Sequence, residues 1–149
     1  MTVRVRDRGA RRVVQALRSR GHVDVGVLGP KSQEGHQGAQ MTVADIAAVH
    51  EFGTDRIPRR SWLSGYIDAN QKEIKRVMRV LARKVEKGRM TLREAHATLG
   101  VFIQGQIQAR IAQNIPPPLA ESTIARKGSS VALIDTDQLR SAITHRVEG

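Results

Sequence analysis

The sequence predicts an α+β fold, in which a long antiparallel helical hairpin and short helices pack with a small antiparallel sheet. Three observations predict it. Residues 22–28 alternate apolar and other side chains, as a half-buried strand does. Residues 62–115 carry apolar side chains three and four positions apart, which is typical of amphipathic helices. Residues 143–147 alternate again, so we expect strands from the N-terminal and C-terminal parts to pair.

Length and composition indicate a single domain over residues 1–149. The aromatic content is only 3%, so the core must be built mainly from Val, Ile, Leu and Ala. There is no cysteine, which excludes disulfides, thiolate metal sites and cysteine nucleophiles. No apolar run approaches the ~20 residues of a membrane span. We therefore expect neither a membrane partner nor a targeting segment.

The strongly basic charge points to a polyanionic partner. The formal net charge is +11 and the sequence pI is about 11.3. Such a chain is attracted to phosphate backbones or to acidic protein surfaces. Composition leaves both open.

The first elements are a helix and a strand. Residues 7–19 carry apolar side chains at helical spacing, with arginines on the remaining surface, and Gly21 ends this helix. The strand at 22–28 follows, and this order excludes an all-α fold. Residues 29–41 are rich in glycine and have no apolar period, which predicts a mobile loop. Its Gly29-Pro30-Lys31-Ser32 is no phosphate-binding loop, because Pro30 lacks an N–H and the full motif is absent.

A helix is predicted from Thr42, where Thr-x-x-Asp forms a capping box. Its expected apolar face is Ile46, Val49 and Phe52. His50 and Glu51 lie near its end, but a metal site would need a third ligand four positions on, where Thr54 stands. We interpret this pair, and likewise Glu94 and His96, as structural. No catalytic residue, metal site or cofactor is predicted.

The stretch from Val49 to Leu63 forms a hinge. Gly53 can close the preceding helix, and Ile57-Pro58 forces an extended entry into the next element. The two large aromatic side chains on either side of the hinge are expected to dock the N-terminal unit onto the long helices. The candidate interface residues of this hinge are Phe52, Gly53, Ile57, Pro58, Arg60 and Trp62.

The first helix of the hairpin is predicted from about Trp62 to Gly88. Its apolar residues are Ile67, Ile74, Val77, Met78, Leu81 and Val85. At ~100° per residue, a basic row lies almost opposite them. That row is Lys72, Arg76, Arg79, Arg83 and Lys87. This row could simply be a solvated face. It could also be a surface for DNA or an acidic neighbour, because residues 71–89 contain eight Lys or Arg and only two Glu.

The second helix starts at a capping box, Thr91 with Glu94, and its apolar face continues to Ile115. The short link predicts an antiparallel hairpin over about residues 62–115.

Residues 116–149 form a C-terminal loop and strand. Pro116-Pro117-Pro118 is expected to run as polyproline II, and residues 122–130 as a basic loop or brief helical turn. Asp135 and Gln138 predict a capped short helix through Ser141 or Ala142. The strand that follows is expected to pair with residues 23–28.

Several of these pieces together resemble a family of tailed-phage and prophage proteins, the virion morphogenesis or tail-completion proteins of the head-tail junction. The matching pieces are Ala48-Val49-His50-Glu51-Phe52-Gly53, Ile57-Pro58-Arg59-Arg60-Ser61-Trp62-Leu63, Pro116-Pro117-Pro118-Leu119-Ala120, Ser122-Thr123, Arg126-Lys127-Gly128 and Leu133-Ile134-Asp135-Thr136. Their order and spacing carry the similarity, which spans roughly residues 40–145. Two positions depart from the pattern: Ser61 stands where the family usually has proline, and Asp137 where it usually has glycine.

The resemblance implies a non-enzymatic virion component, assembled in the host cytoplasm, that forms a homo-oligomeric ring of six-fold symmetry. Such a ring would sit between the head connector and the tail-terminator or tail-tube proteins, around the DNA channel. The basic row would then face DNA or an acidic collar, and we favour protein contact because an exit channel should not hold its cargo tightly. The main alternative is a free, sequence-independent nucleic-acid-binding protein, and an enzyme is a third possibility.

Overall fold

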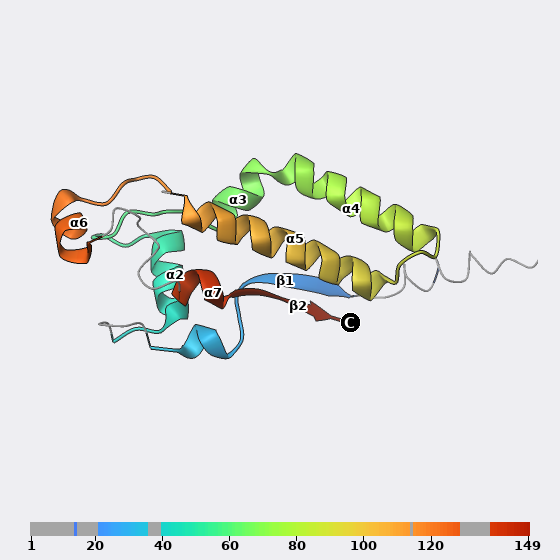
Figure 1. Ribbon diagram of the computed structural model, residues 1–149, viewed down its shortest axis with the longest axis horizontal. Coiled ribbons are helices and arrows are strands. Elements are labelled where there is room, and N and C mark those ends of the chain that lie inside the picture. Colours follow the sequence, from blue (N-terminus) through green and yellow to red (C-terminus); the bar gives the residue numbers. More distant parts are fainter. Residues whose placement is uncertain (1–13, 15–20, 36–39, 114, 129–137) are drawn as a thin grey trace, which may run out of the picture.

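The computed structural model describes residue 14 and residues 21–35, 40–113, 115–128 and 138–149. Within these ranges the longest helix, α5, lies between a second long helix, α4, and a two-stranded sheet (Figure 1). The elements are β1 His22–Val27, a 3₁₀ helix η1 Pro30–Gln33, α2 Val43–Phe52, α3 Ser64–Ala69, α4 Gln71–Glu86, α5 Leu92–Ala112, α6 Glu121–Lys127, α7 Gln138–Ala142 and β2 Ile143–Glu148. The predicted α+β class is confirmed, with helices predominating.

The sheet joins distant parts of the sequence, as the alternating patterns predicted. β1 and β2 are antiparallel, with register from His22 opposite Glu148 to Val27 opposite Ile143. The sheet packs on α5, and Gly100 makes this approach possible. A Cβ at that position would lie 2.5 Å from Cδ2 of His145 and 2.9 Å from Cγ2 of Val23.

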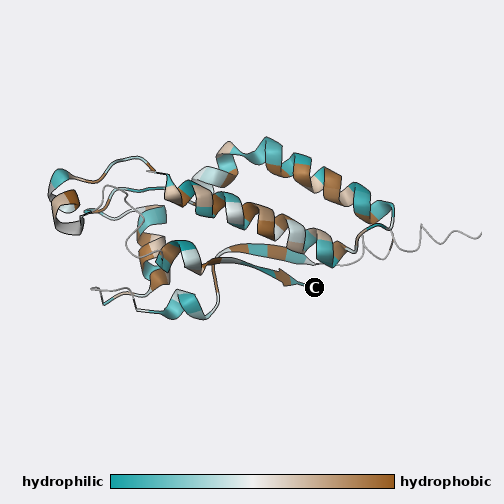
Figure 2. Ribbon diagram, viewed as in Figure 1, coloured by the Kyte–Doolittle hydropathy of each residue, from teal (hydrophilic) through white to brown (hydrophobic). Residues whose placement is uncertain are grey.

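The core is centred on α5, which contributes its largest group of buried side chains: Ala95, Leu99, Ile103, Ile107 and Ile111. Polar side chains of the same helix hold the C-terminal elements. Gln108 donates from Nε2 to the carbonyls of Arg140 and Ile143, at 3.2 and 3.1 Å. Nδ1 of His145 lies 2.7 Å from Oε1 of Gln104. α7 and β2 are thereby fixed to the middle of the molecule. Figure 2 shows hydrophobic positions alternating with hydrophilic ones along both long helices.

The hairpin of α4 and α5 is present, but its first helix is shorter than predicted. The helix is interrupted at Asn70, which separates α3 from α4. Its first residue is Ser64 rather than Trp62. The Asn70 side chain donates from Nδ2 to the Tyr66 carbonyl at 2.8 Å. Asparagine side chains compete in this way with regular backbone bonding. The capping box of Thr91 and Glu94 at the start of α5 is confirmed.

The apolar face predicted for α2 was wrong. Its capping box is present, with the Thr42 hydroxyl accepting from the Asp45 N–H. However, the buried residues lie four apart at Val43, Ala47 and Glu51. Phe52 follows Glu51 and is therefore turned ~100° away, so its side chain is 75% exposed.

Three loop predictions also changed. Within 29–41, residues 30–33 form η1, whose Ser32 is buried and donates from Oγ to the Gly29 carbonyl. Pro116 and Pro117 lie in a bend in place of the expected polyproline II run. The peptide that joins them is cis. Residues 121–127 form the brief helix that was one of two expectations. Of the predicted helix at 7–19 only residue 14 is described, and it is helical. The cap at Asp135 falls outside the described residues, while α7 ends at Ala142 as expected.

Candidate interaction surfaces

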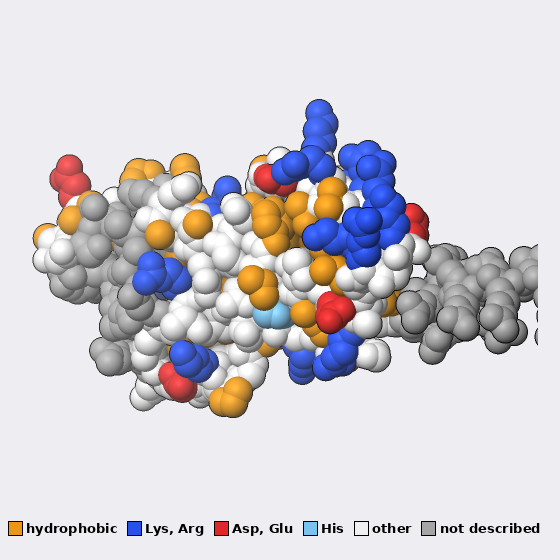
Figure 3. Space-filling view, turned by 45° about the vertical axis from the view of Figure 1, so that its right-hand side comes forward, with side chains coloured by type: hydrophobic (Ala, Val, Ile, Leu, Met, Phe, Trp, Pro, Cys, Tyr) orange, Lys and Arg blue, Asp and Glu red, His pale blue; other side chains and the backbone are white. Residues whose placement is uncertain are grey.

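The basic row forms an exposed face along α4. Its five members, Lys72, Arg76, Arg79, Arg83 and Lys87, are all exposed. Figure 3 shows Lys and Arg side chains gathered at the upper right of the molecule. The predicted exposure of the basic side of α4 is therefore confirmed, whereas its partner stays a prediction.

The opposite side of α4 explains this orientation. Leu81 is buried against α5, while Ile74, Val77 and Val85 are half-buried on the same core. Because packing fixes the apolar side, the basic side must face outward.

Within the described part of the chain, few contacts offset the charge of this row. Arg76 pairs with Glu73, with Nη2 and Oε1 3.4 Å apart and both side chains largely exposed. Such pairs contribute at most about 1 kcal/mol. Arg79 donates from Nε to the Lys75 carbonyl at 3.3 Å, which leaves its charge in place. The face therefore keeps a strongly positive potential, suited to a polyanion.

The hinge residues separate into inward-facing and outward-facing groups. Trp62 is buried and donates from Nε1 to the Ala47 carbonyl at 3.0 Å. Arg60 is buried as well, and its Nε and Nη2 donate to the carbonyls of Pro117 and Pro118, at 2.8 and 3.3 Å. Burial lowers the pKa of the Arg60 guanidinium. These two residues hold the hinge against α2 and against the segment after α5.

The remaining hinge residues shape its outer surface. Gly53 adopts φ 77° and donates its N–H to the Val49 carbonyl at 2.8 Å, which closes α2. Ile57 and Pro58 are exposed. The expectation that Phe52 docks the N-terminal unit was wrong, because its ring points into solvent.

Glu51 is the residue that performs the docking instead. Its buried carboxylate accepts the backbone N–H groups of Leu63 and Ser64, at 2.9 and 3.1 Å, and the Ser64 hydroxyl. A carboxylate at the start of α3 satisfies amides that the helix leaves unpaired. The predicted structural role of Glu51 has this physical basis. Nothing in the local sequence pattern signals it, because the donating amides lie more than ten residues away.

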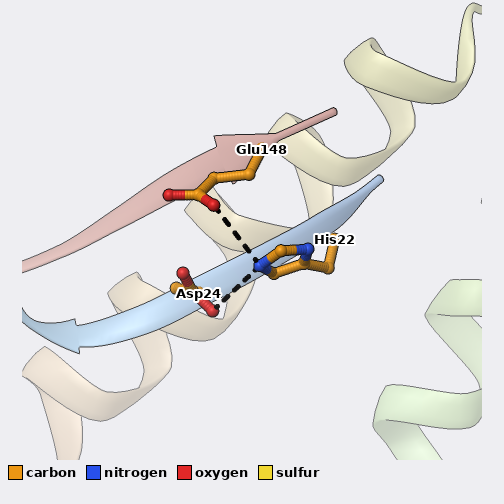
Figure 4. Close-up of side chains that lie close together, drawn as sticks. All are labelled: His22, Asp24 and Glu148. Atoms are coloured by element: carbon orange, nitrogen blue, oxygen red, sulfur yellow. Dashed lines mark ion pairs between the residues drawn. The ribbon is translucent and has the colours of Figure 1, made fainter. Parts of the chain in front are cut away.

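A cluster that the sequence did not reveal lies at one end of the sheet (Figure 4). Nε2 of His22 is 3.7 Å from Asp24 and 3.8 Å from Glu148. The other oxygen of each carboxylate faces Arg146, at 3.4 and 2.9 Å. Imidazole and carboxylates can ligate a divalent cation, but here Arg146 already supplies positive charge between them. The arrangement is a cross-strand ion network that favours the observed register.

Comparisons of the chain with protein-family models, with curated proteins and with solved structures returned no match. The resemblance to tail-completion proteins therefore stays a prediction from the sequence. Among the described residues, no helix combines the length and the apolar character that crossing a bilayer requires.

Proposed function

We propose that the chain is a structural, non-enzymatic component of a phage head-tail connector. In this proposal its copies form a six-fold ring around the DNA channel and join the head connector to the tail-terminator or tail-tube proteins. The exposed basic row on α4 is the observation that carries the proposal, because it is a long charged face on a helix held rigidly by α5. The order of the sequence pieces that resemble tail-completion proteins supports it.

The mechanism is electrostatic seating. A closed ring repeats each basic row around its axis, which multiplies a modest local attraction. An acidic collar on a neighbouring ring would meet these rows and fix the orientation of the two rings. Weak, salt-sensitive contact with DNA in the channel is compatible with the same charge.

The second candidate is a free, sequence-independent nucleic-acid-binding protein. The net charge of +11 favours it. The two candidates differ in assembly: a connector subunit forms a defined ring, whereas a free binding protein needs none.

The experiment combines light scattering of the purified protein, electron microscopy of particles, and binding of duplex DNA at low and physiological salt. The connector role predicts a discrete oligomer, location at the head-tail junction, and DNA affinity that falls steeply with salt. A variant carrying Arg76→Gln, Arg79→Gln and Arg83→Gln should fold normally but join particles poorly. A stable monomer that binds DNA tightly and is missing from particles would contradict the proposal and favour the second candidate.

A further inference from the structure

Phe52 differs from the other aromatic side chains because the core does not bury it. The chain has four aromatic residues, and the structure describes all of them. Trp62 and Tyr66 are buried and Phe102 is half-buried against the core, whereas Phe52 is 75% exposed. A chain with only 3% aromatic residues thus leaves one large ring in solvent. Aromatic side chains often anchor protein interfaces, so this ring is a candidate anchor.

The ring lies at the start of a closed loop whose backbone is bonded at both its base and its tip. This hinge loop, residues 53–60, joins α2 to α3. Its base is closed where the Arg60 N–H donates to the His50 carbonyl at 2.7 Å. Its tip is closed where the Thr54 N–H donates to the Ile57 carbonyl at 2.8 Å. The Thr54 hydroxyl also accepts the Ile57 N–H at 3.0 Å. The loop is therefore held in one shape.

The two arms of the hinge loop touch beside Phe52. A Cβ at Gly53 would lie 2.9 Å from the backbone nitrogen of Arg59, so the arms approach as closely as glycine permits. Arg59 also donates from Nε to the Glu51 carbonyl at 3.1 Å, which ties the second arm to α2. Phe52 precedes the point of contact on one arm and Pro58 precedes it on the other. Both residues are exposed.

Buried side chains fix the hinge loop to the rest of the molecule. Arg60 donates to the carbonyls of Pro117 and Pro118, and the Glu51 carboxylate accepts N–H groups at the start of α3. Figure 1 shows the loop at the end of the molecule where α6 lies, away from the link between α4 and α5. Because the loop is already ordered in the free chain, binding through it would lose little conformational entropy.

Shape and charge define the partner that this surface fits. Residues 54–59 are exposed without interruption, so the loop projects from the surface. Its charged residues are the cations Arg56 and Arg59 and the anion Asp55, and Ile57 adds apolar surface. A projecting loop of this kind fits a concave receptor, with an apolar floor for the ring and acidic groups at the rim.

We propose that Phe52 anchors the chain to a different protein, by inserting its ring into an apolar pocket whose rim is acidic. A nucleic acid can stack a base on the ring, but it offers nothing to Ile57 and Pro58. A second copy of the chain is a poor source of an acidic rim, because it carries 25 Lys and Arg against 14 Asp and Glu. The hinge loop is separate from the basic row on α4, so the inference goes beyond the connector role and does not depend on it.

The test places a photo-cross-linker in the hinge loop of the full chain. Benzoylphenylalanine replaces Ile57, which is 37% exposed, and the protein is made in the cell that naturally produces it. Mass spectrometry identifies the cross-linked peptides, and their yield is compared in the unchanged background and with Phe52→Ser, Arg56→Gln or Met78→Ser. Met78 is the matched control, because it is an apolar residue on α4 that is 49% exposed. Fluorescence of Trp62, the single tryptophan, checks that each variant keeps its contact with α2.

Position 57 should cross-link to one other protein, at a site that combines apolar residues with Asp or Glu. Phe52→Ser should lower the yield by about tenfold or more, as expected when a ring buried in the interface is removed. Arg56→Gln should lower it by a few-fold, because one contact with the acidic rim is lost. Met78→Ser should leave the yield unchanged.

Four results would overturn the inference. The first is cross-linking from position 57 no greater than from the same cross-linker at position 78, and the second is an equal yield with and without Phe52→Ser. The third and fourth are cross-links to nucleic acid or to a second copy of the chain, which would identify a different occupant. Absence of the chain from phage particles would remove the connector role but would not affect this measurement, so the two failures are distinguishable.

Discussion

The two long helices of the hairpin pack against each other but differ in burial: α5 supplies the largest group of core side chains, whereas α4 exposes most of its own. α5 is enclosed by α4 on one side and by the sheet on another, and two of its isoleucines, Ile107 and Ile111, have no exposed surface. Among the described residues, α4 is covered on one side only, where Leu81 is its single buried residue. Stability should therefore depend on α5, whereas α4 is free to carry charge. The contrast teaches that a charged face can lie on a helix beside the core without weakening the core.

The largest effect should come from truncating α5 in the core. Ile107→Ala leaves a cavity at a fully buried site and should reduce the free energy of unfolding by about 2–5 kcal/mol. Val80→Ala on α4, by contrast, should change it by less than about 0.5 kcal/mol. Urea denaturation measures both. Similar losses of unfolding free energy in the two variants would show that stability does not depend more on α5 than on α4.

The next effect concerns the contact between α5 and the sheet. Gly100→Ala would force its Cβ into the His145 ring and should cost about 1–3 kcal/mol through overpacking. Gly105→Ala is the matched control on the same helix, because its Cβ meets open space. It should stabilise by about 0.5–1 kcal/mol, since alanine is the better helix former. Thermal unfolding should therefore move in opposite directions for the two glycines.

A smaller effect distinguishes the starts of the two helices. The backbone N–H and the hydroxyl of Thr91 lower the pKa of Glu94 at the start of α5. Asn70 at the start of α4 makes no side-chain capping bond.

Because the folded pKa of Glu94 lies below its unfolded value, its contribution is present at neutral pH and is lost as pH falls through the lowered value. Glu94→Gln should therefore flatten the loss of stability below about pH 5, measured by urea titrations across pH. An unchanged pH profile would contradict this reading.

The smallest effect on stability should come from the basic row. Arg79→Gln and Arg83→Gln, alone or together, should leave the free energy of unfolding within about 0.5 kcal/mol of the wild type. Removing like charges spaced four apart even relieves a few tenths of a kcal/mol of repulsion. A loss above 1 kcal/mol in calorimetry would mean that these side chains support the fold rather than a partner.

Much of the fold could be predicted because local patterns determine it. The alternation at Val23, Val25 and Val27 and again from Ile143 predicted the strands and their pairing. Thr42 and Thr91 predicted two helix starts, since capping depends only on residues three positions apart. The outward direction of the basic row followed from the apolar residues on the opposite side of α4.

The remaining features depend on contacts between distant residues. Glu51 is buried because its carboxylate accepts the backbone N–H groups of Leu63 and Ser64, and the burial of Glu51 turns its neighbour Phe52 outward. The helix break at Asn70 depends on its side chain, which donates to the Tyr66 carbonyl; asparagine occurs both within helices and at their ends. The ion network at His22 exists only once register is fixed. Periodicity carries no information about such partners.

The pairing of β1 with β2 has a consequence for biosynthesis. Asp24 and Arg146, which face each other across the sheet, are 122 residues apart in the chain. A ribosome adding about 5–20 residues per second needs on the order of ten seconds to bridge that interval. During this time β1 has been synthesised but its partner strand β2 has not, so β1 is unpaired and accessible to chaperones.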